Sequence, residues 1–430
     1  MANGDERRLD LARQMLAELR RRLSLTPAFE LWDGSTVPAG AHHEDLRIRF
    51  ADEGVIASLL RAPRLATVIR LHAEGRLVIA GGSLFDVAET RPRGKVGRLL
   101  KSIDRGLALR TALAFVFRPA RPAGAAPAVE LSGLKRHDLP SAFFELFLDR
   151  SMTFSSAYFA SPDMTLEAAQ AMKLDLVCRK LRLEPGERLL DVGCGWGALA
   201  CHAAAHYGVN AHGITLSEEQ YLHARETVAR LGLRDRVEIE LADIADLDGA
   251  YDKIASIGMF ETIAADRHPV YFRKVHALLR DRGLYLHQAI TRRAKASERA
   301  FHRKRAEYQS LVGHVFPTGD VDHVGHTLKE LEVFGFEVHD VEALREHYTR
   351  TSEIWARRLM AAEAEADELV GAATRRLWVA YLTTVSLGFA RGSLGTYQTL
   401  ASKRSRGLSG LPLNRAAMYA GTMDAATDDR

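Results

Sequence analysis

The 430-residue sequence predicts an α/β protein in which a doubly wound parallel sheet follows a smaller α+β domain. Three observations predict this fold. The stretch LLDVGCGWGALA at residues 189–200 has the pattern of a strand, a glycine turn and a helix. Strand-like and helical segments alternate after it. A proline-, alanine- and glycine-rich stretch at residues 118–127 separates two halves with different patterns.

The glycine turn predicts a cofactor site. Asp191 ends the apolar strand, and Gly193, Gly195 and Gly197 follow it. A chain that reverses from strand to helix needs positive φ and no Cβ, and the helix start offers free N–H groups to a polar ligand. NAD fits poorly, because the spacing is G-x-G-x-G and the next strand, 210–215, ends in a threonine instead of an acidic residue. A turn that serves packing alone stays open as the alternative.

Composition limits the compartment and the partners. The three cysteines, Cys178, Cys194 and Cys201, form no C-x-x-C pair, which favours reduced thiols in the cytoplasm. There is no signal-peptide pattern and no run of about 18 apolar residues, so we expect neither export nor membrane spanning. With a formal charge of only +4, we expect no nucleic-acid partner. Basic clusters such as 20–22 and 403–406 would suit an anionic surface or a solvated face.

The first half of the chain predicts a small α+β domain, residues 1–120. Residues 10–25 have apolar side chains at helical spacing and many arginines, so this helix either packs on its own domain or lies on a membrane surface. Strand, helix and strand patterns follow between 45 and 86. We expect a linker at 121–132, the second domain at 133–410 and a C-terminal tail at 411–430.

The second half alternates as a doubly wound sheet requires. Helices are expected at 139–149, 166–181 and 269–279, and strands at 189–192, 210–215, 237–240, 252–257 and 283–289. Ligands of such sheets bind outside the carboxyl ends of the strands. The candidate site residues are therefore Asp191, Thr215, Asp243, residues 258–261 and His287.

A series of motifs carries a family resemblance from residue 133 to 406. In chain order they are HDLPSAFFELFLDRSMTFSSAYF, LLDVGCGWGALA, GITLSEEQ, SIGMFE, YFRKVHALLRDRGLYLHQAI, HVFPTGD and RGSLGTYQ. Together they resemble the cyclopropane fatty acid synthase family of S-adenosylmethionine-dependent methyltransferases. Residues 47–82 resemble, more loosely, the N-terminal domain of full-length bacterial members. The resemblance implies a Rossmann-like class I methyltransferase domain.

The resemblance also implies a cofactor site for S-adenosyl-L-methionine. The glycine turn would hold the methionine part, with Ser155 at its carboxylate, Thr215 and Gln220 at the ribose and Asp243 at the adenine amino group. Taken alone, Asp243 has a capping explanation as well. The implied cofactor-binding residues are Phe154, Ser155, Asp191, Gly193, Gly195, Gly197, Thr215, Gln220 and Asp243.

The chemistry implied is attack of a cis double bond on the sulfonium methyl group, followed by proton loss that closes a cyclopropane ring. Glu261, His287 and Tyr348 match family residues that hold a bicarbonate ion as the base, and Ser156 stands where a cysteine contributes its backbone amide. No metal is expected. A carbocation needs a dry site with aromatic faces. The candidate aromatic residues, each of which packing alone also explains, are Phe154, Tyr158, Phe159, Phe260 and Trp355.

Three positions depart from the family pattern around the expected pocket. Ser156 replaces a cysteine, Thr262 a histidine and Ala289 an isoleucine. A reshaped pocket would allow a methyl-branched chain or a methylated diene, on the way to furan fatty acids, instead of a cyclopropane. A catalytically silent lipid-binding module is a further alternative, and a small-molecule methyltransferase is a weaker one, since the resemblance extends past the cofactor half into the substrate half.

The resemblance implies an unsaturated phospholipid or acyl chain as the substrate. We expect the protein to reach it as a peripheral protein at the inner face of the membrane, with the N-terminal domain and its arginines docking on anionic lipid. The sequence itself does not indicate the oligomeric state, and the resemblance leaves a homodimer open, because full-length relatives commonly form dimers.

Overall fold

The computed structural model describes residues 2–90, 103–119, 139–301 and 321–419. The linker expected at 121–132, the HVFPTGD stretch at 314–320 and residues 420–430 of the expected tail lie outside the described residues. The described residues form two compact units. One holds those up to 119 together with Val370–Thr383, and the larger unit holds the rest.

The N-terminal unit is the α+β domain that the sequence predicts. Its sheet has the order β2-β1-β3-β4, in which β1 runs parallel to β3 and the other pairs are antiparallel. Its elements are α1 (Ala2–Leu23), β1 (Ala28–Glu30), β2 (Thr36–Val37), β3 (Arg47–Phe50), α2 (Gly54–Arg61), α3 (Leu65–Ala73), β4 (Leu77–Ala80), α4 (Leu84–Glu89) and α6 (Arg105–Phe115).

Helix α1 packs on its own domain, which decides between the two roles open for the expected helix 10–25. Its Ala12 and Leu16 belong to a core that also contains Phe29, Val55 and Phe115. The helix extends further toward the N-terminus than the apolar pattern indicates, since its first two turns are largely exposed and polar.

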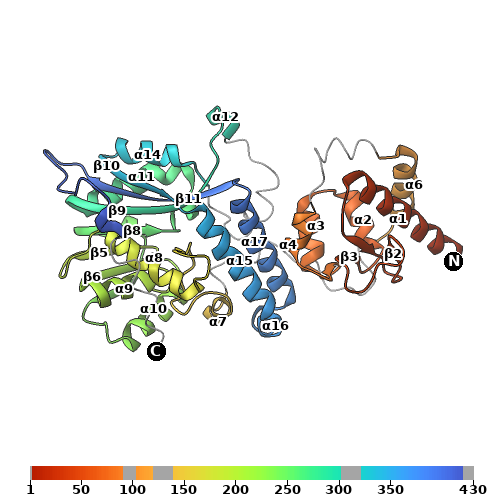
Figure 1. Cartoon of the computed structure of the whole chain (residues 1–430), viewed down its shortest axis with the longest axis horizontal. Coiled ribbons are helices and arrows are strands. Elements are labelled where there is room, and N and C mark those ends of the chain that lie inside the picture. The colour runs from red at the N-terminus through yellow and green to blue at the C-terminus, as the bar shows by residue number, and fades with distance from the viewer. Residues whose placement is uncertain (1, 91–102, 120–138, 302–320, 420–430) are drawn as a thin grey trace. The chain divides into compact units, whose positions relative to one another are not determined.

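The larger unit contains a seven-stranded sheet with the order β10-β11-β9-β8-β5-β6-β7 (Figure 1). Strands β5 to β9 are parallel, and β11 is antiparallel to both β9 and β10. The strands are β5 (Arg188–Val192), β6 (Asn210–Thr215), β7 (Val237–Leu241), β8 (Tyr251–Ile257), β9 (Leu279–Arg292), β10 (Phe336–Ala343) and β11 (Leu394–Lys403). The expected doubly wound sheet is confirmed, with two antiparallel strands added at one edge.

The helices of this unit cover both faces of the sheet. Helices α8, α9 and α10 enclose one apolar core with the strands, and α11 and α14 enclose a second core on the other face. The helices are α7 (Ser141–Glu145), α8 (Leu166–Lys180), α9 (Ala198–Tyr207), α10 (Glu218–Arg230), α11 (His268–Leu278), α12 (Glu298–Phe301), α14 (Val324–Val333), α15 (Arg345–Ala361), α16 (Glu363–Val370) and α18 (Ala416–Tyr419). Helix α17 (Ala372–Ala390) is divided between the units, with its residues up to Thr383 in the N-terminal unit and the rest in the larger one.

The start of the expected tail is part of the larger unit. Leu411 and Met418 pack against the core beneath α8 and α9, and the Arg415 guanidinium lies 2.5 Å from a carboxylate oxygen of buried Asp340. Among the described residues, no helix combines the length and the apolar character that crossing a bilayer requires.

Candidate active site

The glycine turn links β5 to α9 and is fastened to the neighbouring strand. The N–H groups of Gly193 and Cys194 both donate to the Ile214 carbonyl of β6, at 3.0 and 2.9 Å. Gly193, Gly195 and Gly197 have φ values of +76°, +58° and +87°. This left-handed backbone favours glycine, so the local sequence dictates the shape of the turn.

The three glycines have different surroundings. A Cβ on Gly193 would lie 2.6 Å from Met259, and one on Gly197 would lie 3.2 Å from Ala224 of α10. A Cβ on Gly195 would meet no heavy atom within 4 Å, and Gly195 lines a cavity. Gly193 and Gly197 therefore permit close packing, and Gly195 leaves space for a ligand.

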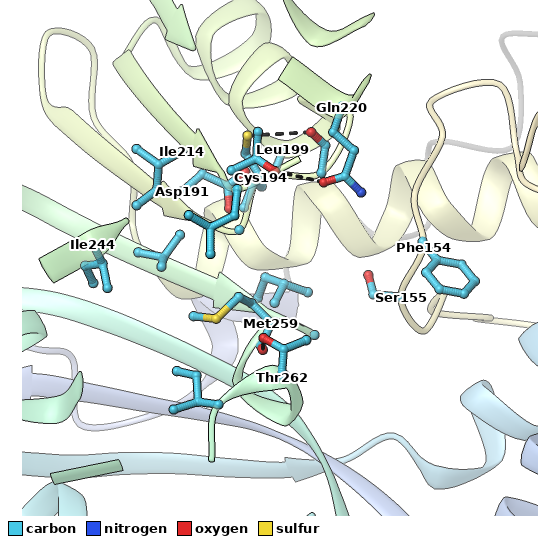
Figure 2. Close-up of a pocket in the computed structure, with 18 of the residues that line it drawn as sticks. Phe154, Ser155, Asp191, Cys194, Leu199, Ile214, Gln220, Ile244, Met259 and Thr262 are labelled. Atoms are coloured by element: carbon cyan, nitrogen blue, oxygen red, sulfur yellow. Dashed lines mark hydrogen bonds between the residues drawn. The ribbon is translucent and has the colours of Figure 1, made fainter. Parts of the chain in front are cut away.

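The cavity has a volume of about 570 Å³ and lies where β5, β6 and β8 end (Figure 2). Gly197 is absent from its lining. The expected cofactor-binding residues that line it are Phe154, Ser155, Asp191, Gly193, Gly195, Thr215, Gln220 and Asp243. The structure thus collects eight of nine residues that are scattered over 90 positions of the sequence, Phe154 to Asp243, into one pocket.

One end of the pocket carries a buried lysine that the sequence analysis did not single out. Lys173 of α8 is 2% exposed, lines the cavity, and its Nζ donates to Ser155 Oγ at 3.2 Å. Gln170, one turn earlier, donates to the backbone carbonyls of Thr153 and Ser155 and holds their loop across the helix. Burial lowers the pKa of Lys173 to about 8, against the opposing effect of Asp149 and Asp191.

Lys173 was detectable in principle. It lies in the stripe of α8 that Ala169, Leu176 and Lys180 continue at helical spacing, and this whole stripe is buried. A lysine within a buried stripe is costly unless a polar group or a ligand accepts its charge. The position of Lys173 within a buried, otherwise mostly apolar stripe is therefore the sequence signal that indicates a functional role.

Asp191 lies at the end of β5 beside this lysine. It is 3% exposed, and burial raises the pKa of its carboxyl group to about 7, with the charge of Lys173 opposing the rise. A cationic group placed in the pocket near Asp191 would favour the carboxylate form. This end of the pocket therefore offers both a buried ammonium and a buried carboxyl group.

The opposite end of the pocket is also polar, because side chains from the end of β6, the start of α10 and the turn after β7 line it. Thr215 Oγ1 donates to Gln220 Oε1 at 2.9 Å, which leaves the Gln220 amide nitrogen without a hydrogen-bond partner among the described residues. Asp243 caps the short helix Ile244–Asp246 by accepting from Ala245 N at 2.9 Å, and it lines the pocket as well. Figure 2 shows Ile244 and Ser155 on opposite sides of the cavity.

Phe154 forms an aromatic wall of the pocket, and further aromatic side chains pack behind it. The ring of Phe154 stacks on Trp355 of α15 with centroids 5.0 Å apart. Tyr348 contacts the edge of Trp355 at 6.0 Å and stacks on Phe389 at 4.5 Å. Tyr348 thus lies behind the aromatic wall, outside the pocket lining.

Glu261 is buried next to a pocket residue, Thr262, but does not itself line the pocket. It belongs to the short helix Phe260–Thr262 after β8, is 6% exposed, and accepts a hydrogen bond from Ile290 N of β9. Its neighbour Phe260 meets the ring of His287 edge-on at 4.8 Å.

His287 of β9 is buried within a chain of hydroxyl groups. Its Nδ1 lies 2.9 Å from Tyr285 Oη, which lies 3.1 Å from Tyr271 Oη, and Tyr271 lines the pocket. Burial, reinforced by His268, lowers the pKa of His287 to about 3, so the ring is neutral near pH 7. Its Nε2 is buried without a hydrogen-bond partner among the described residues.

The departures from the family pattern lie in different surroundings. Thr262 lines the pocket, and its hydroxyl donates to the Met259 carbonyl at 2.7 Å. Ser156 is fully buried and donates to the Ala157 carbonyl, and Ala289 belongs to the core under α11. Among the aromatic candidates, Tyr158 and Phe159 stack on His347, outside the pocket lining.

The described residues fit the cofactor that the resemblance implies. The cradle at Gly195 is one that a Cβ would fill, and the flanking pocket ends offer the charges that an amino-acid zwitterion needs and the hydrogen-bonding groups that a nucleoside needs. For bicarbonate, neither Glu261 nor His287 lines the pocket, and the supporting observation is the buried Nε2 of His287, which has no hydrogen-bond partner among the described residues. A neutral imidazole can donate one hydrogen bond from that nitrogen.

Comparisons with known proteins agree with this geometry. The mycolic acid cyclopropane synthetase family matches residues 129–399. A probable fatty acid methyltransferase of Pseudomonas putida is 40% identical over 286 residues, which are 66% of this chain and 72% of that protein. The cyclopropane synthase MmaA2 from Mycobacterium tuberculosis superposes with a TM-score of 0.60 and 32% identity, covering 65% of this chain and all of that one.

A further solved structure, the mycolic acid cyclopropane synthase CmaA1 in complex with SAH and CTAB, gives a TM-score of 0.59 and 33% identity over 64% of this chain and 98% of that one. These matches span the glycine turn, the pocket and the strands that position them. The chain therefore belongs to the mycolic acid cyclopropane synthetase family and is an S-adenosylmethionine-dependent methyltransferase of the cyclopropane synthase type.

Proposed function

We propose that this enzyme methylates the cis double bond of an unsaturated phospholipid acyl chain and forms a cyclopropane ring. The observation that carries the proposal is the single cavity that joins the glycine turn and its charged end to the aromatic wall of Phe154. A polar cofactor and an apolar chain would meet there without water between them.

The cofactor would be held along the carboxyl ends of the strands. The amino-acid part would lie at Gly195, Ser155 and Asp191, and the nucleoside would lie between Gln220 and Asp243. When bound, S-adenosylmethionine supplies an electrophilic methyl group. The protein's contribution is to fix its orientation and to keep the surrounding space apolar.

The names of two relatives support an acyl substrate. One is called a probable fatty acid methyltransferase and the other a cyclopropane synthase. In this chain Phe154 lines the pocket and offers a π face that would stabilise positive charge on the acyl chain, and Trp355 stacks on Phe154 outside the pocket lining. Trp355 is 1% exposed, so it packs as a buried support for Phe154.

The proton released on ring closure needs an acceptor. We propose Glu261 and His287 as the residues that hold a bicarbonate ion for this purpose, with Tyr348 supporting the wall beside it. The unpartnered Nε2 of His287 supports an anion in this region. His287 stays neutral near pH 7 and would donate to the ion from one ring nitrogen.

One observation favours a second product. Thr262, which replaces a histidine of the family pattern, lines the pocket and directs its hydroxyl to the Met259 carbonyl. The pocket wall then lacks a ring at this point, and a different proton of the methylated chain could leave. The second candidate function is therefore the same methylation ending in a methyl-branched chain or a methylated diene.

One experiment separates these outcomes. The enzyme is incubated with S-adenosylmethionine and liposomes of cis-monounsaturated phospholipid, and the acyl products are analysed by mass spectrometry and proton NMR. A gain of one CH2 with upfield ring protons is the expected result. The same gain in mass with an olefinic proton and an ordinary methyl signal would establish the second candidate. Absence of any gain, with cofactor binding intact, would refute both for this substrate.

We also propose that the enzyme reaches its substrate as a peripheral protein at a bilayer surface, because an acyl chain must enter the pocket from a membrane. Co-sedimentation of the full chain with anionic liposomes tests this, and recovery of all protein in the supernatant would contradict it.

A further inference from the structure

Helix α6 of the N-terminal unit has two sets of apolar side chains, one buried in its own domain and the other exposed. Thr111 and Phe115 are buried, and Phe115 is part of the core formed with α1 and α2. Leu109, Leu113 and Phe117, in contrast, are 61%, 60% and 86% exposed. A spacing of four residues places Leu109 and Leu113 one turn apart on the same face, and Phe117 follows just after the helix ends.

Two arginines border this apolar stripe. Arg105 lies one turn before Leu109, and Arg110 lies on the other flank of the stripe at 100° per residue. Both are exposed, and neither has an ion-pair or hydrogen-bond partner among the described residues. The nearby acid, Asp104, caps the helix by accepting from Leu107 N.

An apolar stripe flanked by arginines is the pattern of a helix that lies in a membrane interface. Apolar side chains enter the acyl region while the guanidinium groups stay at the level of the phosphates. Helix α1 lacks this arrangement, because its Leu16 is buried and its Arg21 and Arg22 pair with Glu18. The most exposed large apolar side chains of this unit thus lie on and just after α6, beside two exposed arginines, whereas Leu60, Leu65 and Val68 of α2 and α3 are only 37%, 44% and 36% exposed.

We propose that the exposed face of α6, formed by Leu109, Leu113 and Phe117 with Arg105 and Arg110, docks the enzyme on an anionic lipid bilayer. The proposal rests on the proposed function, since it supplies the surface from which an acyl chain would be drawn. Charge complementarity selects the occupant. Two arginines that have no ion-pair partner among the described residues match lipid phosphates, whereas a second copy of the same face would bring like charges together.

The test is vesicle sedimentation with the full chain. Vesicles of phosphatidylglycerol and phosphatidylcholine are compared with vesicles of phosphatidylcholine alone. The variant Leu109→Gln/Leu113→Gln keeps residues suited to a helix and is expected to lower the partition coefficient about tenfold or more. Arg105→Gln/Arg110→Gln is expected to lower it roughly tenfold on anionic vesicles only, and high salt should remove that difference.

A matched control replaces two exposed leucines elsewhere. Leu408 and Leu413 are 88% and 106% exposed and lie outside helices, so Leu408→Gln/Leu413→Gln should sediment within about twofold of the unaltered chain. S-adenosylhomocysteine affinity, measured by calorimetry, should be equal in all variants, because none of these residues lines the pocket.

Sedimentation of the α6 leucine variant equal to that of the unaltered chain would overturn the proposal. So would a leucine variant that turns a dimer into a monomer while vesicle binding persists, because the face would then be a subunit interface. Measuring product formation on detergent-dispersed phospholipid distinguishes failure of the proposed methyltransferase function from failure of the proposed docking by α6. If the unaltered chain binds vesicles but forms no product, the proposed function is refuted and the docking proposal is not. If the α6 leucine variant methylates dispersed lipid but does not bind vesicles, the result supports docking through the exposed face of α6.

Discussion

The ammonium group of Lys173 lies 3.2 Å from the hydroxyl oxygen of Ser155, and both line the pocket. Because Ser155 Oγ accepts from Lys173, its own proton is directed to another acceptor. Within the described residues no carboxylate lies within 4 Å of Lys173 Nζ to form an ion pair, so a ligand carboxylate would complete the charge balance. Asp191 would then receive the ligand's amino group.

Replacing this lysine should weaken binding of the amino-acid part of the ligand. Lys173→Met removes the charge at similar volume, and S-adenosylhomocysteine affinity should fall about ten- to a hundredfold, the value of a charge-assisted hydrogen bond. Affinity for 5′-methylthioadenosine, which lacks the amino acid, should hardly change. Calorimetry with both ligands measures this difference.

The control is the other buried lysine of the same helix. Lys180 pairs with Glu342 and binds Gln398, outside the pocket. Lys180→Met should destabilise the fold and spare the preference between the two ligands. An equal loss of affinity for both ligands in Lys173→Met would show that Lys173 is structural.

Gly195→Val should abolish cofactor binding by filling the cradle. Gly186 provides a matched control, since it too has positive φ, +85°, and no heavy atom within 4 Å of the point where a Cβ would lie, but it is outside the pocket. Both valine variants should lose about 1–2 kcal/mol of unfolding free energy from backbone strain. Only Gly195→Val should lose S-adenosylhomocysteine affinity, by a hundredfold or more in calorimetry. Equal affinities in the two variants would mean that the turn is structural.

Much of the sheet could be predicted because its signals are local. Gly193, Gly195 and Gly197 mark the β5 turn by a backbone requirement that a single stretch of sequence displays. Strands β6 and β8 are short segments whose carboxyl ends place Thr215 and Gly258 at the pocket, as the parallel topology demands.

The missed features depend on contacts between distant segments. Strand β11 is buried along most of its length, so the sequence shows no alternation there, and its position between β9 and β10 is a tertiary fact. The role of Lys173 depends on the loop of Ser155 crossing α8, 18 residues away in sequence. The packing of Leu411 likewise follows from the shape of the core and not from a local pattern.

Glu261→Gln should separate turnover from binding. The amide oxygen of glutamine can still accept from Ile290 N, so the link between the short helix after β8 and β9 survives. Turnover should fall roughly 10²–10⁴-fold if the carboxyl group takes part in proton removal. S-adenosylhomocysteine affinity should stay within about twofold.

A partly buried glutamate that does not line the pocket serves as the control for Glu261→Gln. Glu330 of α14 has a side chain that is 13% exposed, and Glu330→Gln should leave turnover unchanged. Normal turnover in Glu261→Gln would remove Glu261 from the proposed proton path.

The buried carboxyl group of Asp191 should make the stability of the cofactor-free protein depend on pH. Its pKa in the folded protein is raised from 3.8 to about 7, so between about pH 4 and 7 the unfolded chain ionises first and binds fewer protons. The free energy of unfolding should therefore fall as pH rises through this window, by roughly 4 kcal/mol at most, at about 1.4 kcal/mol per pKa unit.

Asp191→Asn cannot ionise and should lose this dependence. The pKa of Lys173 is lowered from 10.5 to about 8, so its effect on stability has the opposite sign and falls in a separate window above pH 8. In that window the unfolded chain binds more protons than the folded protein, and the free energy of unfolding rises with pH. Urea unfolding followed by tryptophan fluorescence at pH 5 and pH 7.5 measures the slope, and it is the slope that counts because the substitution also changes packing. Equal slopes in the unaltered protein and in Asp191→Asn would show that Asp191 is already ionised in the folded protein at pH 5. Saturating S-adenosylhomocysteine should flatten the slope of the unaltered protein, because the bound ligand favours the ionised form of Asp191.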